Sequence, residues 1–179
     1  LAGFPAISRR PLQQTIHEYF RTRHEIDVPL DYTQSRNISD LVARQETDVA
    51  LTVLHSDRDE VRAMPVSLVQ ALCVIPHDHR LAAKATIDAR DLEGESFISL
   101  GRTDQSRLAI DKIFDGLGVR RRLQMETTQS DIACGLVAQG CGVSIVDRLT
   151  MSWYRDARIV ARAFEPALSF KIWLLRLRS

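Results

Sequence analysis

Residues 127–147, TTQSDIACGLVAQGCGVSIVD, carry the signals of a complete strand, helix, strand unit. Two threonines close an incoming strand, and Ser130 or Asp131 is well placed to cap the next helix. Gly140 stands where that helix would stop, and the short apolar run 143–146 predicts a buried strand. Such a unit builds a parallel sheet. The helix is expected to bury one apolar face, made by Ile132, Leu136 and Val137.

The start of this helix is the first candidate for ligand contact. Unpaired N–H groups and a macrodipole worth about half a positive charge favour a carboxylate or phosphate at such a position. Thr127, Thr128 and Ser130 supply hydroxyls beside it. Because the same residue types also cap helices, capping alone stays open as an alternative explanation.

The composition is that of an ordinary soluble globular protein. Of 179 residues, 45% are hydrophobic and 26% charged, and 24 basic residues against 23 acidic ones give a formal net charge of +1. This balance offers no strongly basic surface for nucleic acid. Cys73, Cys134 and Cys141 lie in apolar surroundings without CxxC spacing, which favours buried thiols in a reducing compartment. Such thiols lead us to expect a cytoplasmic protein. No apolar run reaches the roughly 18 residues of a membrane span.

The first 55 residues read as a β-α-β-α-β series. Strands are expected at 1–4, 28–33 and 48–53, with helices that begin after a turn at residues 6–8 and near Ile38. We expect the three strands to lie parallel in one sheet. Ligands of such sheets bind at the carboxyl ends of the strands.

A second βα series runs from about 95 to 147. The long apolar strand 65–76 joins the two series, and strands at 159–164 and 170–177 close the chain. This layout predicts two α/β lobes linked by two crossings, with a cleft between strand ends. It also predicts that strands 48–53 and 143–146 belong to different sheets.

Neither of two clusters of basic residues is predicted to be a functional site. Arg120, Arg121 and Arg122 begin a strand, and adjacent like charges usually form a solvated surface. His77 and His79 have no third ligand in sight, so no metal site is predicted.

No nucleophile with a base, no paired carboxylates and no phosphate loop is visible, so an enzyme is not expected. No cofactor is implied.

Four stretches, in this order along the chain, together resemble the effector-binding domain of LysR-type transcriptional regulators. They are ISDLVARQETDVALTV (38–53), VIPHDHRLAA (74–83), DLEGESFISL (91–100) and LVAQGCGVSIVD (136–147). The resemblance runs from Leu1 to about Leu175. It implies an α/β, two-lobed, periplasmic-binding-protein-like (type 2) fold with two crossover connections and a central ligand cleft.

The resemblance also implies a domain division and partners. Lobe I would comprise 1–66 and 164–179, and lobe II 67–163. The family's winged helix-turn-helix is absent from this chain, so DNA contact would come only through that domain. The expected partners are a small effector and further copies of the chain, as a homodimer or homotetramer, and no membrane.

Three positions depart from the family pattern, since Arg80, Ser96 and Asp147 stand where proline is common. Asp147 would put a carboxylate at the mouth of the cleft, as if for a cationic ligand group. This aspartate and the stretch SLGRTDQSR (99–107) look most like the branch that responds to opines and basic amino acids.

Carried over residue by residue, the resemblance implies nine effector contacts. Hydroxyls and helix N-termini would take a carboxylate, and Asp104 or Asp147 would take an ammonium or guanidinium group. The nine are Ser8, Ser35, Arg36, Arg102, Thr103, Asp104, Thr128, Ser130 and Asp147.

The leading hypothesis is therefore a sensor domain of a bacterial transcription regulator that binds an amino-acid-derived effector such as an opine. The alternative is a periplasmic solute-binding protein of a transporter. A signal peptide in the native gene would favour transport, and a helix-turn-helix would favour regulation.

Overall fold

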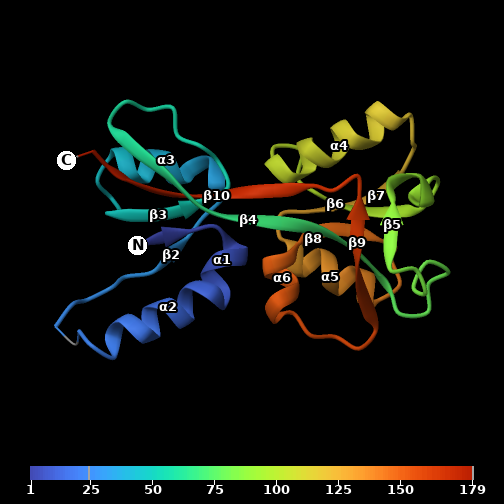
Figure 1. The fold of residues 1–179 in the computed structure, drawn as a ribbon, viewed down its shortest axis with the longest axis horizontal. Coiled ribbons are helices and arrows are strands. Elements are labelled where there is room, and N and C mark those ends of the chain that lie inside the picture. The colour runs from blue at the N-terminus through green and yellow to red at the C-terminus, as the bar shows by residue number, and fades with distance from the viewer. Residues whose placement is uncertain (24, 179) are drawn as a thin grey trace. The chain divides into compact units, whose positions relative to one another are not determined.

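The chain divides into two compact units, Leu1–Leu68 with Lys171–Ser179, and Val69–Phe170. The structure is a computed structural model that describes residues 1–23 and 25–178 (Figure 1). The boundaries expected from the sequence followed residues 66 and 163. Here the second division follows Phe170, because the strand Ile159–Glu165 pairs with strands of the second unit.

The first unit begins with short strands and helices in alternation. β1 pairs in parallel with both β2 and β3, which confirms the expected parallel arrangement. The turn expected at residues 6–8 is wrong, since this segment is helical. Proline is favoured in the first helical turn, where its fixed φ suits the helix and no N–H is needed. The elements are β1 (Ala2–Gly3), α1 (Pro5–Arg9), α2 (Pro11–Phe20), β2 (Asp31–Tyr32), α3 (Ser35–Ala43) and β3 (Val49–Thr52).

The second unit holds most of the longer elements. Figure 1 shows α5 and α6 close to β8 in this unit. Its elements are β5 (Thr86–Asp88), the 3-10 helix η1 (Ala89–Leu92), β6 (Ser96–Leu100), α4 (Gln105–Leu117), β7 (Arg122–Thr127), α5 (Ser130–Ala138), β8 (Ser144–Asp147), α6 (Arg148–Trp153) and β9 (Ile159–Glu165).

Two long strands have residues in both units, β4 (Val61–Pro76) and β10 (Ser169–Leu177). The order of paired strands is β2-β1-β3-β10-β4-β9-β5, and β8 also pairs with β4. The expectation that strands 48–53 and 143–146 lie in different sheets is therefore wrong as stated. A strand of 16 residues is long enough to pair in both units.

The unit predicted from residues 127–147 is present as β7, α5 and β8. β7 pairs in parallel with β6, and Phe97 of β6 forms a parallel bridge with Val143. Of the face expected to be buried, Val137 is in the core and Leu136 packs against it, but Ile132 is 48% exposed, so the expectation is wrong at Ile132. Small side chains let α5 lie close to the strands, and the buried residues are Ala133, Cys134, Val137 and Ala138.

The expectation that residues 120–122 form a solvated surface is wrong for Arg121, because its side chain is buried. Its side chain is 5% exposed, and its guanidinium carbon lies 4.0 Å from the Phe114 ring centroid and 4.7 Å from that of Phe97. Burial lowers the pKa of this arginine, and a hydrogen bond to Asp111 opposes the effect. The two neighbouring arginines are exposed, as expected.

Among the described residues, no helix combines the length and apolar character needed to cross a bilayer.

Candidate effector-binding residues

Ser8 lies in α1 of the first unit with its hydroxyl buried. The residue is 7% exposed, and among the described residues its Oγ has no hydrogen-bond partner. A Cβ added to Gly3 would come 2.5 Å from this oxygen, so only glycine at the end of β1 leaves it room. A buried hydroxyl without a partner is costly in a folded protein, and a ligand acceptor would offset that cost.

Ser35 is the first residue of α3 and Arg36 the second. Ser35 is half-buried, Arg36 is exposed, and the first turn of the helix carries no acidic residue. The Thr52 hydroxyl at the end of β3 donates to the Ser35 carbonyl at 3.4 Å, which ties the helix start to the strand end. This helix N-terminus therefore has the electrostatic character of an anion site.

The loop after β6 carries the next three predicted contacts, all in the second unit. Arg102 and Thr103 are exposed, and Arg102 Nε lies 3.8 Å from Glu126 Oε2. Asp104 is the N-cap of α4, where its Oδ1 accepts from the Ser106 N–H at 2.8 Å and from the Arg107 N–H at 3.3 Å. Asp104 thus already has a structural role.

Two residues that the sequence did not single out hold this loop in place. Arg107 is 7% exposed and donates from Nη1 to the Leu100 carbonyl at 3.1 Å and from Nε to Asp111 Oδ2 at 2.6 Å. Asp111 also accepts from Arg121. The spacing of four between Arg107 and Asp111 on a helix is a visible signal for this pair.

Thr128 and Ser130 flank the start of α5. Thr128 is exposed, and Ser130 is half-buried at the first helical position. Neither Ser130 nor Asp131 caps the helix as expected, because the N-cap is Gln129 and its side chain makes no capping hydrogen bond. Ser130 Oγ instead donates to Asp147 Oδ2 at 3.0 Å.

Asp147 ends β8 and is the N-cap of α6. Its carboxylate accepts from the Thr150 N–H at 2.8 Å and from the Thr150 hydroxyl at 2.9 Å, in addition to the bond from Ser130. The structure thus brings Ser130 and Asp147 together. Asp147 and Asp131 lie near Cys134 of α5, and burial first, then these two carboxylates, raises the pKa of its thiol to about 12.

A family model described as the LysR substrate binding domain matches residues 1–179. The chain belongs to the LysR substrate-binding domain family. Relatives with identities above 30% include two named regulators. The regulatory protein NocR of Agrobacterium tumefaciens (strain T37) is 32% identical over 166 residues, which cover 93% of this chain and 55% of NocR. The transcriptional activator protein LysR of Escherichia coli (strain K12) is 31% identical over 177 residues, or 98% of this chain and 57% of LysR.

A solved structure supports the same assignment at the level of fold. The CcmR regulatory domain of Synechocystis PCC6803, in complex with 2-PG, matches with a TM-score of 0.88 at 18% identity, over 99% of this chain and 86% of that one. The expected α/β, type 2 periplasmic-binding-like fold is confirmed. The chain spans about half of the length of NocR, since the match covers 55% of that protein.

Proposed function

We propose that this LysR-family domain is the ligand-sensing part of a bacterial transcription regulator, and that its effector is a small amino-acid-derived molecule such as an opine. The names of NocR and LysR support regulation, and the small molecule bound to CcmR supports effector sensing. We infer the effector class from a difference in charge between two sets of predicted contacts. One set lies in each unit.

The first set suits a carboxylate. Ser35 opens α3, whose first turn has no acidic residue, and Arg36 adds a positive charge at the same helix start. The buried Ser8 hydroxyl can donate a further hydrogen bond. A carboxylate there would accept from backbone N–H groups and hydroxyls, and would interact favourably with the helix dipole.

The second set suits a cation. Asp131 lies in the first turn of α5, and Asp147 accepts a bond from Ser130 at the same helix start. These two carboxylates oppose anion binding at this N-terminus and favour an ammonium or guanidinium group. We propose that one effector has both kinds of group and contacts both sets. Amino acids and opines have this combination.

The regulator is favoured over the periplasmic solute-binding protein because both named relatives are regulators. An enzyme is not proposed for the same reason. In the full-length protein, we propose that a winged helix-turn-helix outside this chain contacts DNA, and that effector binding shifts a conformational equilibrium within a homodimer or homotetramer. The free-energy difference between the two conformations would change by the difference in effector-binding free energy between them.

The first experiment is a thermal-shift screen of this chain against amino acids and opines. A ligand present at about 100 times its Kd should stabilise the fold by about 2.7 kcal/mol. The best ligand is then titrated by calorimetry into Ser35→Ala and Ser130→Ala. Each variant should weaken binding about ten- to a hundredfold, since each removes a hydrogen bond to a charged group.

Ser169→Ala is the matched control, because Ser169 is exposed and outside the predicted contacts. It should leave affinity unchanged. If both Ser35→Ala and Ser130→Ala bind as tightly as the parent chain, the proposed contacts are wrong.

A further inference from the structure

A polar pocket lies wholly within the first unit. It has a volume of about 490 Å³ and is open to solvent. Its polar lining comes from the loop after β3, from the start of β4 and from the end of β10. The lining side chains that matter for its chemistry are His55, Ser56, Arg62, Arg176 and Arg178.

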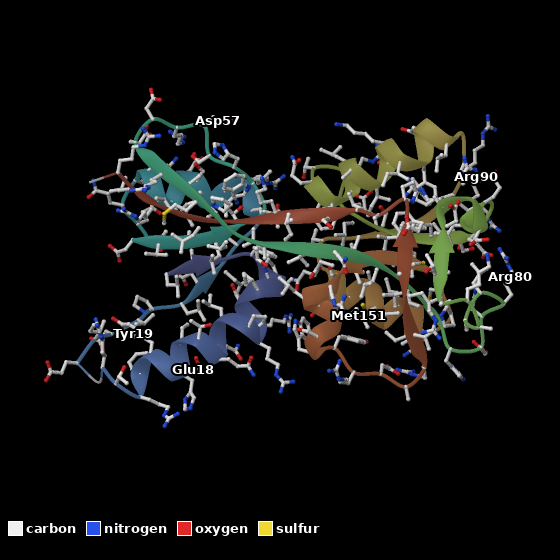
Figure 2. The ribbon with its side chains drawn as sticks, viewed as in Figure 1. Glu18, Tyr19, Asp57, Arg80, Arg90 and Met151 are labelled. Atoms are coloured by element: carbon white, nitrogen blue, oxygen red, sulfur yellow. The ribbon has the colours of Figure 1, made fainter. Side chains whose placement is uncertain are left out.

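The charge of this lining is positive. Among the described residues, three arginines and one histidine line the pocket, and no aspartate or glutamate does. Of the acidic residues close in sequence, Glu60 pairs with Arg58, and Asp57 pairs with His55, which is itself a lining residue. Asp57 has a side chain that is 98% exposed, and Figure 2 shows it on the outside of its loop.

The sheet holds the three arginines close together. Arg176 lies near the end of β10 and Arg178 directly follows the strand, two residues further along the chain. β4 is the neighbouring strand, and the Arg178 N–H donates to the Glu60 carbonyl at 2.9 Å, which brings the start of β4 and Arg62 alongside. The cluster therefore follows from the pairing of β4 with β10.

In the described part of the chain, none of these three guanidinium groups makes an ion pair with a carboxylate. The one side-chain hydrogen bond among them runs from Arg176 Nη1 to the Leu177 carbonyl at 3.3 Å, which leaves the charge uncompensated. Like charges held close together repel, and a bound anion would relieve that repulsion. Ser56 is 5% exposed beneath them, where its Oγ lies 2.6 Å from Ser39 Oγ.

We propose that this pocket binds a small anion with at least two negative charges, either a phosphate ester or a di- or tricarboxylate. The guanidinium fork matches the oxygens of both groups, and the volume is that of a small-molecule site. None of the lining residues belongs to the nine predicted effector contacts, so this is a second site. It does not depend on the proposed effector.

The test uses the 179-residue chain and three probes, pyrophosphate, citrate and acetate. Calorimetry at moderate salt should give saturable 1:1 binding of pyrophosphate or citrate, and no measurable binding of monovalent acetate. Arg62→Gln and Arg178→Gln, tested separately, should each weaken binding about tenfold or more, because each removes a charged hydrogen-bond donor. The tighter of the two probes identifies the ligand as phosphorylated or polycarboxylic.

Arg21→Gln is the matched control, since Arg21 is an exposed arginine of the same unit that does not line the pocket. It removes the same charge and should leave binding unchanged. The proposal is overturned if no probe binds saturably. It is also overturned if Arg21→Gln weakens binding as much as the pocket variants do, because the anions would then sense only the net charge.

Discussion

Ser130 Oγ donates a hydrogen bond of 3.0 Å to Asp147 Oδ2, and so links the first residue of α5 to the cap of α6. The two residues are 17 positions apart and lie at the two ends of the helix and strand that the sequence showed most clearly. The carboxylate therefore has a structural role whether or not it binds a ligand. The structural role can be measured without any effector.

Asp147→Ala should destabilise the fold by roughly 1 to 2 kcal/mol, because the N-cap of α6 and the partner of Ser130 are lost together. Asp147→Asn should cost less, since the amide oxygen can still accept from the Thr150 N–H, which lies 2.8 Å from Oδ1 in the parent. Urea unfolding followed by circular dichroism measures both. Equal stability of Asp147→Ala and the parent would show that the cap contributes nothing.

Gly142 is the position least able to accept a side chain. Its φ is 143°, and an added Cβ would lie 2.3 Å from the Ser96 carbonyl oxygen, next to the bridge between Phe97 and Val143. Gly142→Ala should cost roughly 1 to 3 kcal/mol from backbone strain alone, and more from the clash. Thermal unfolding measures the loss.

Gly116 in α4 provides the control, because its added Cβ would meet nothing within 4 Å and its φ is ordinary. Gly116→Ala should leave stability unchanged or raise it by up to about 1 kcal/mol. The explanation for Gly142 fails if the two variants unfold at the same temperature.

Most helices and strands could be predicted because periodicity and turn residues are local signals. The burial of Ile132 on α5 was mispredicted for a physical reason. Ile132 is larger and more apolar than Ala133 and Cys134, but it is these two smaller residues that face the core where α5 approaches β6 and β8. Hydrophobicity alone cannot show how near a helix will lie to its sheet.

The site was less predictable, because its contacts join residues far apart in the chain. The capping role of Asp147 could have been considered from the sequence, since Asp is among the favoured N-cap residues and it directly precedes the residues that form α6. The resemblance to the LysR family instead led to the prediction that Asp147 binds a ligand. The burial of Arg121 depends on Phe97, Phe114 and Asp111, which only the fold brings together.

The three cysteines should differ in reactivity. Burial raises the pKa of the Cys73 thiol, and the pKa of Cys134 is raised to about 12, so neither forms much thiolate at neutral pH. Cys141 is half-buried and should react first. A thiol-reactive chromophore should therefore count one rapid thiol in the folded chain and three in denaturant. In Cys141→Ser the rapid phase should be absent, and its persistence would contradict this assignment.

Arg121→Ala should be the most destabilising of these substitutions. The side chain is 5% exposed, packs on the rings of Phe97 and Phe114, and pairs with Asp111, which also holds Arg107. The loss should be roughly 3 kcal/mol, the lower end of the range for breaking a buried ion pair, because Asp111 is 29% exposed and keeps Arg107 as a partner. Urea unfolding gives the free-energy difference.

Arg122→Ala is the control, since Arg122 is the neighbouring arginine, the first residue of β7, and is exposed. It should change stability by no more than about 0.5 kcal/mol. A double-mutant cycle of Arg121→Ala with Asp111→Ala then isolates the ion pair: the double variant should lose less than the sum of the single losses. If the losses simply add, Arg121 stabilises the unit through its contacts with the two phenylalanines and the ion pair contributes nothing.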